Sequence, residues 1–162
     1  MPNALKELLL GRGWAGRTIS REQTVERINP LIEQQIRLNH AYRAVVRSHS
    51  RPTVTEALED VLKTARTDVA KLSEVVFSAG GSAYNGTDLE PEDFDLGDDD
   101  RTMLDTLRDR EVDFQEAVAY ERNEVEHQMR TRAILEVVKG NSDERLDRID
   151  TLLRNQSRSP AA

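Results

Sequence analysis

The spacing of apolar residues along the chain predicts a protein built almost entirely of helices. Ser20 opens the sequence SREQ, in which Gln23 completes a capping box, so a helix is expected to begin directly after Ser20. Pro30 lies inside this segment, and it either kinks one long helix or occupies the first turn of a shorter helix capped by Asn29. Apolar side chains recur at helical intervals up to about Ser48, at Val25, Ile28, Ile32, Leu38, Tyr42 and Val45.

A second helix is predicted after the break at Arg51-Pro52, with Thr53 as its cap. The pair Gly80-Gly81 is expected to end it, because glycine readily adopts the left-handed conformation that closes many helices. The apolar positions of this helix alternate by three and four residues, at Val54, Leu58, Val61, Ala65, Val69, Leu72 and Val76.

Residues 80–100 form a long acidic connection, which suits a crossover from one end of a helical bundle to the other. The charges of Asp98, Asp99 and Asp100 favour the start of a third helix there. Its expected buried positions are Met103, Leu104, Leu107, Phe114, Ala117 and Val118.

The helical pattern then persists to Val138, and a turn into a fourth helix is expected near Arg122-Asn123, although no Gly or Pro marks it. Gly140, Asn141 and Ser142 predict a clearer break, beyond which apolar residues continue to Leu153. No segment shows the alternation typical of a strand.

The amino-terminal sequence NALKELLL predicts a short amphipathic helix. The following GRGWAG, residues 11–16, matches the pattern G-x-G-x-x-G, but a dinucleotide-binding fingerprint follows a strand, and this one follows a helical segment. It is interpreted as a flexible joint. The predicted organisation is an arm and hinge over residues 1–19, a helical bundle over 20–155 and a disordered tail over 156–162.

Composition narrows the possible functions. The chain has 162 residues, a net charge of −7 and no cysteine. The acidic balance argues against nucleic acids and anionic membranes as partners, and no stretch approaches the ~20 apolar residues of a membrane span. Thiolate metal sites and cysteine nucleophiles are excluded. The expectation is a soluble cytoplasmic protein.

Three stretches resemble the small uncharacterised ferritin-like domains of bacteria: INPLIEQQIRLNHAYRAVV, LSEVVFSAGGSAYNGT, and the region from REVDFQEAV through RTRAILEVV to LDRIDTLL. The resemblance covers roughly residues 24–155. It implies an all-α, ferritin-like four-helix bundle with a long crossover loop between its second and third helices, preceded here by the helical arm.

A ferritin-like di-metal centre takes a Glu from each of two helices and a Glu-x-x-His pair from each of the other two. Glu124 and His127 have this paired spacing. In the second helix, however, Ala65 and Asp68 stand at the matching spacing, and that helix contains no histidine. The sequence therefore predicts an incomplete site and no bound metal or other cofactor.

The remaining ligands of such a centre are only partly present. Glu33 lies in a plausible place in the first helix, as does Glu111 or Glu116 in the third. The orientation of Glu124 and His127 stays open, because two apolar stripes fit this segment. The first, formed by Val118, Val125 and Met129, points the pair outward; the second, formed by Tyr120, Thr131, Ile134 and Val138, points it inward.

Other candidate sites are weaker. Residues 88–100 carry eight carboxylates, but counted from Asp93 the glycine falls at the fifth rather than the sixth place of a calcium-binding EF-hand loop. A solvated loop is the simpler interpretation. Ser73, Ser78 and Ser82 have no histidine nearby in sequence and no nucleophile-elbow motif. His40 and His49 are interpreted as structural residues.

These patterns favour a non-enzymatic bundle that works by self-association, with a dimer preferred, or by binding an unidentified protein partner. The arm carries apolar side chains that need a cover, Leu5, Leu8, Leu9 and Leu10, and its glycines would let it reach a neighbouring subunit. The alternative is a di-iron or di-manganese ferritin-like protein with a redox or iron-handling role.

Overall fold

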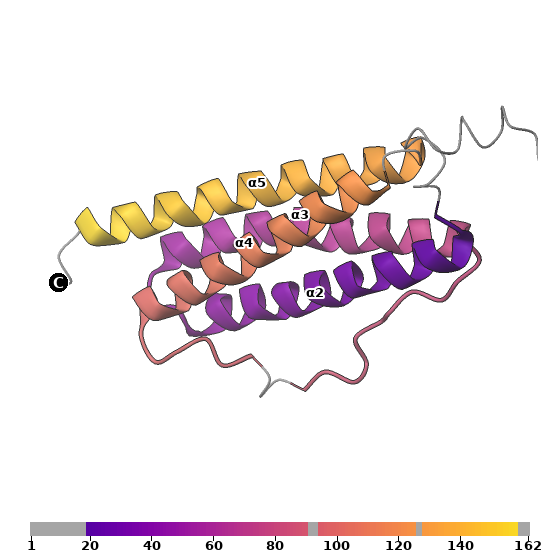
Figure 1. Cartoon of the computed structure of the whole chain (residues 1–162). Helices are drawn as coiled ribbons and strands as arrows, with labels where there is room; N and C mark the ends of the chain where they lie inside the picture. The colour runs from indigo at the N-terminus through magenta and orange to yellow at the C-terminus, as the bar shows by residue number, and fades with distance from the viewer. Residues whose placement is uncertain (1–18, 91–93, 126–127, 159–162) are drawn as a thin grey trace, which may run out of the picture.

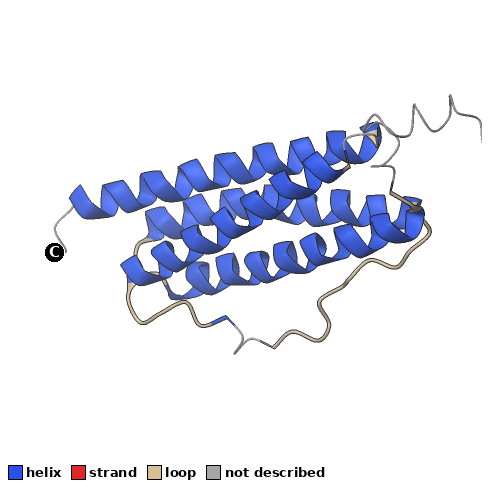
Figure 2. Ribbon diagram, viewed as in Figure 1, coloured by secondary structure: helices blue, strands red, loops and turns tan. Residues whose placement is uncertain are grey.

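The computed structural model describes residues 19–90, 94–125 and 128–158. Four long helices lie side by side as a bundle (Figure 1). No strand occurs within the described ranges (Figure 2), which confirms the all-α prediction. None of the helices in these ranges is long and apolar enough to cross a membrane. The helices are α2 (Arg21–Ser48), α3 (Pro52–Ser78), α4 (Asp100–Glu124) and α5 (Met129–Arg158).

Helix α2 begins with the predicted capping box. The Gln23 backbone N–H donates to Ser20 Oγ at 3.1 Å, and the Ser20 N–H donates to Gln23 Oε1 at 2.8 Å. The helix continues through Pro30 to Ser48, so the long-helix alternative holds. Asn29 does not cap a shorter helix. Its amide instead ties α2 to the loop after α3, donating to the Ser82 carbonyl at 3.0 Å and accepting from the Tyr84 N–H at 2.9 Å.

The two ends of α3 differ in how well they were predicted. Thr53 as the cap is wrong, because α3 already begins at Pro52, whose fixed φ suits the first helical position. The end at Gly80-Gly81 is confirmed. Gly80 has φ +80° and donates to the Phe77 carbonyl at 2.9 Å, while Gly81 donates to the Val76 carbonyl at 3.0 Å. This pair of bonds is a Schellman motif.

The connection between α3 and α4 is the predicted crossover, and it runs along the outside of α2 over the length of the bundle (Figure 1). It stays close to α2, since the Phe94 ring stacks on His40 with centroids 4.8 Å apart. Its described acids act as local acceptors: Asp88 accepts from the Tyr84 hydroxyl at 2.7 Å, and Asp99 caps α4 by accepting from the Thr102 N–H at 2.9 Å.

The boundary between α4 and α5 lies at residues 125–128, close to the expected turn near Arg122-Asn123. The predicted break at Gly140–Ser142 is wrong, because α5 runs unbroken from Met129 to Arg158. Asn141 and Ser142 act as helix residues whose side chains bond to buried carboxylates on other helices.

Helix α5 also extends past residue 155, where the bundle was expected to end. Ser157 secures this last turn, donating to the Leu153 carbonyl at 3.1 Å and accepting from Arg101 Nη1 at 2.7 Å. The arm and hinge were predicted over residues 1–19, and residues 1–18 of this segment lie outside the described residues.

The apolar stripes of the four helices meet in one core. Most of the positions predicted from periodicity are buried, and Met129, which is 83% exposed, is the main exception. Fully burying each Leu or Ile contributes roughly 1.5–3 kcal/mol. The largest fully buried apolar side chains besides Tyr42 are Phe114, Ile28, Ile32, Leu38, Leu58, Leu72, Leu104, Leu107, Leu135 and Ile149.

His49 closes the corner between α2 and α3. Its backbone N–H donates to the Val45 carbonyl at 2.8 Å, and its buried ring accepts at Nδ1 from the Arg51 N–H at 3.1 Å. The Nε2 atom has no partner within the described part of the chain. Burial lowers the pKa of His49, and the Asp100 carboxylate, 3.8 Å from Nδ1, opposes this effect.

The lowered pKa of His49 predicts a pH dependence of stability. The unfolded chain takes up a proton at the ordinary pKa of 6.5, whereas the folded protein does so only at lower pH. The contribution of His49 to the free energy of unfolding should therefore be constant above pH 6.5. It should fall as the pH drops from 6.5 towards the lower pKa that His49 has in the folded protein. Urea denaturation of wild type and His49→Asn at pH 7.5, 6.5 and 5.5 measures this. Equal pH slopes for the two proteins would contradict the prediction.

Candidate functional site

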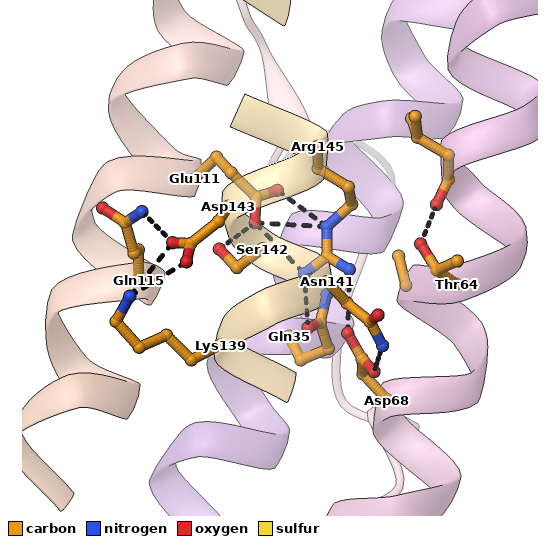
Figure 3. Close-up of polar contacts among 12 residues, drawn as sticks. Gln35, Thr64, Asp68, Glu111, Gln115, Lys139, Asn141, Ser142, Asp143 and Arg145 are labelled. Atoms are coloured by element: carbon orange, nitrogen blue, oxygen red, sulfur yellow. Dashed lines mark hydrogen bonds and ion pairs between the residues drawn. The ribbon is translucent and has the colours of Figure 1, made fainter. Parts of the chain in front are cut away.

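A buried arginine lies at the centre of the bundle. The side chain of Arg145, on α5, is 1% exposed, and its guanidinium donates hydrogen bonds to acceptors on all three other helices (Figure 3). Nε lies 3.1 Å from each carboxylate oxygen of Glu111 on α4. Nη1 donates to Asp68 on α3 at 2.8 Å, and Nη2 donates to the amide oxygen of Gln35 on α2 at 3.3 Å.

A second set of side chains completes the hydrogen bonding of these acceptors. Glu111 also accepts from the Tyr42 hydroxyl at 2.6 Å and from the Ser142 hydroxyl. Asp68 accepts from the Asn141 amide at 2.7 Å. Gln35 donates to Asn39 at 2.9 Å, and Asn39 donates to the Ala65 carbonyl at 3.3 Å. We call the eight polar residues the central polar network: Gln35, Asn39, Tyr42, Asp68, Glu111, Asn141, Ser142 and Arg145.

The protonation states in this network follow from burial and from the ion pairs. Burial raises the pKa of Asp68, and Arg145 and Asn141 oppose this rise. Burial acts to lower the pKa of Arg145, but Glu111 and the other acceptors outweigh it and raise that pKa overall. Burial and the Glu111 charge raise the pKa of Tyr42 well above its ordinary value. Arg145 therefore stays charged, and Tyr42 keeps its proton and donates it in the hydrogen bond to Glu111.

Local helix geometry explains why these residues meet. Gln35, Asn39 and Tyr42 are four and three residues apart, so they share the inner face of α2. On α5 the buried positions run in the same steps, at Leu135, Val138, Ser142, Arg145 and Ile149. Ser142 and Arg145 thus occupy core positions three residues apart, the spacing that a Glu-x-x-His pair uses in a ferritin-like di-metal centre.

The structure bears out only some of the residues considered from the sequence. Glu111 faces the centre, and Ala65 and Asp68 are both buried on α3 as the spacing suggested. Glu33, in contrast, is 43% exposed and pairs with Arg37 at 3.0 Å on the surface of α2. Glu116 is also exposed.

Glu124 does not reach the centre either. It lies in the last turn of α4, its side chain is 37% exposed, and it is 3.9 Å from Arg27 Nη2. Neither stripe considered for this segment is continuous, because α4 ends at Glu124 and α5 begins at Met129. His127 lies outside the described residues.

Sequence reasoning missed Gln35, Ser142 and Arg145. The signal that could have found them is the unbroken three-and-four spacing of α5 across Gly140, which places Arg145 between Val138 and Ile149 on the apolar face. That signal was hidden, because Gly140-Asn141-Ser142 has the composition of a loop and because arginine is almost never fully buried unless it is paired.

The donor set at the centre does not fit a pair of divalent metal ions. Its carboxylates, Asp68 and Glu111, both bond to the guanidinium, which places a fixed positive charge between them. Gln35 and Ser142 supply an amide and a hydroxyl where such a centre uses carboxylate or imidazole. No group of three or more His, Cys, Asp or Glu side chains that could hold a metal ion occurs among the described residues.

Comparison with known proteins supports the architecture. No family model matches the chain, and no curated protein does. A solved structure described as a ferritin-like, diiron-carboxylate protein from Bacillus anthracis str. Ames superposes with a TM-score of 0.73, covering 84% of this chain and 99% of that one. The fold is ferritin-like. At 15% identity the likeness extends to the ferritin-like fold and not to the di-iron centre of that protein.

Removing the central cation should destabilise the bundle strongly. Arg145→Met leaves Asp68 and Glu111 buried without their counter-charge, and we expect a loss of about 3–5 kcal/mol in the free energy of unfolding at pH 7. The loss should shrink towards pH 5, because the folded variant can neutralise the two carboxylates by taking up protons. Denaturant titrations at the two pH values measure both effects.

The matched control is Arg148→Met, an exposed position one turn further along α5. It should change the free energy of unfolding by no more than about 0.5 kcal/mol at either pH. Equal effects of the two substitutions would show that Arg145 is not the counter-charge of the two carboxylates.

Proposed function

We propose that this protein is a non-enzymatic ferritin-like bundle that acts through its surface, by forming a dimer or by binding another protein. The observation that carries this proposal is the central polar network. The inward positions of the four helices converge on a guanidinium, and the two carboxylates there are already engaged by Arg145, Tyr42 and neighbouring donors. The polar and charged groups that are still available to bind a partner therefore lie on the surface of the bundle.

One end of the bundle supports a role in association. Phe77, Tyr120 and Met129 are 62%, 61% and 83% exposed. They lie at the last turn of α3, near the end of α4 and at the start of α5, which are brought to the same end of the bundle. The ion pair between Arg130 and Glu74, at 3.9 Å, ties α5 to α3 there. Large exposed apolar side chains at the end of a bundle are candidate contacts for a partner.

The amino-terminal segment joins the bundle at this same end. Residues 1–18 lead into Ile19, which packs partly against the core just before the Ser20 cap. The segment carries its own apolar residues, Leu5, Leu8, Leu9 and Leu10. We propose that it covers the apolar end of a second copy, so that each subunit of a dimer shields the other.

Metal analysis separates this proposal from the di-iron or di-manganese alternative. Protein purified without chelator should carry well under one equivalent of iron or manganese. Near-stoichiometric metal would contradict the proposal and support the alternative. His127→Ala is the informative variant in that case, since Glu124 and His127 form the Glu-x-x-His pair in the sequence. Loss of metal in this variant would locate the site at that pair.

The solution mass tests association. Light scattering should give twice the subunit mass for the full chain, and Met129→Glu should lower it to one subunit, because a charge in the contact is strongly unfavourable. Val137→Glu is the matched control, since Val137 is 47% exposed but lies two turns away along α5. Unchanged mass in Met129→Glu, or an equal loss in both variants, would remove this end of the bundle as the contact.

Deleting residues 1–17 tests the amino-terminal segment. The truncated protein should have the mass of one subunit, and in the intact dimer the fluorescence of Trp14, the single tryptophan of the chain, should be shielded from a soluble quencher. A red-shifted and fully quenchable emission would show that the segment covers nothing.

A further inference from the structure

A pocket of about 250 Å³ opens between α2 and α3 on the side covered by the crossover loop. We call it the α2–α3 pocket. Its wall contains both apolar and basic side chains, and none of its lining residues is acidic: Ile36, Asn39, His40, Arg43, Arg66, Val69 and Asn85. It is separate from the central polar network, which it touches only through Asn39.

The positive charges of this pocket lack a counter-charge in the described part of the chain. Burial, followed by the charges of Arg66 and Arg47, lowers the pKa of Arg43. Burial, followed by Arg43 and Arg47, lowers the pKa of His40. The ion pairs of the described residues instead use other arginines, namely Arg27, Arg37, Arg101, Arg108, Arg130, Arg132 and Arg145.

The like charges of Arg43 and Arg66 in the pocket, with Arg47 acting on Arg43 as well, repel one another in the free protein, because no ion pair among the described residues compensates them. Such a cluster becomes favourable when an anion enters it. Guanidinium groups present paired N–H donors that match the oxygens of phosphate. The neighbouring pocket residues are ordered: His40 stacks on Phe94, and the Asn85 side-chain oxygen accepts from the Thr87 N–H at 3.1 Å.

We propose that the α2–α3 pocket binds the phosphate group of a small molecule, with Arg43 and Arg66 as the principal ligands. Ile36 and Val69 provide an apolar wall for the part of the molecule that carries the phosphate. The volume accommodates a small phosphate ester, whereas the net charge of −7 on the chain disfavours the extended backbone of a nucleic acid. The site is independent of the proposed association through the other surface.

Thermal unfolding with added anions tests the proposal. Inorganic phosphate and glycerol 3-phosphate are titrated against the full chain at constant ionic strength, with chloride as the reference salt. Saturable stabilisation by phosphate, of about 2–4 °C or more, is expected for a ligand that binds only the folded state. A larger shift with the ester than with free phosphate would identify esters as the ligand, and equal shifts would identify the free ion. Shifts no larger than that of chloride overturn the proposal.

Two substitutions and a control assign the effect to the pocket. Arg43→Gln and Arg66→Gln should each abolish the phosphate shift, and each should raise the unfolding temperature of the ligand-free protein, because a repelling charge is removed. Arg154→Gln, an exposed arginine near the end of α5, removes the same charge and should keep the full phosphate shift. An equal phosphate shift in all three variants would place the anion elsewhere and overturn the proposal. The solution mass should be unchanged in all three, which separates this result from the test of association.

Discussion

The buried charge of Arg145 is the constraint on which the rest of the bundle depends. An unpaired charge in a protein interior is so unfavourable that the other helices must bring acceptors to the level of the guanidinium. Gln35, Asp68 and Glu111 do so, one from each helix. Sliding any of these helices by one turn would withdraw an acceptor from the centre. The polar network therefore specifies the register of four helices whose apolar stripes alone would tolerate several alignments.

The network also shows how a buried guanidinium can neutralise inward-facing carboxylates in a ferritin-like bundle. Carboxylates that face one another in a core repel, and a cation between them removes that repulsion. In this chain a guanidinium supplies the cation from within the sequence, and it brings directional N–H donors with it. Arg145 is held protonated, so this positive charge is a permanent part of the interior.

The two surfaces proposed to act in this protein differ in their chemistry. The apolar end near Phe77 and Met129 exposes groups that water solvates poorly, while the α2–α3 pocket gathers positive charges that have no counter-charge in the described chain. Asn39 is the link between the pocket and the centre, because it lines the pocket and accepts a hydrogen bond from Gln35. A ligand in the pocket would thus contact a residue of the network that sets helix register.

The sequence by itself determined the all-α architecture and several helix ends, but not the first residue of α3 or the continuity of α5. Helix starts and ends follow from local chemistry, such as the Ser20 capping box and the Gly80-Gly81 terminus, since a cap depends on residues a few positions away. The ferritin-like resemblance likewise singled out Asp68 by its spacing, and it left Glu111 or Glu116 as the candidate in the third helix. Only the tertiary structure decided that Arg145 is buried, because its partners lie 34, 77 and 110 residues away in sequence. No local pattern records such distances, and for that reason a core position of α5 had the appearance of a surface residue beyond a loop.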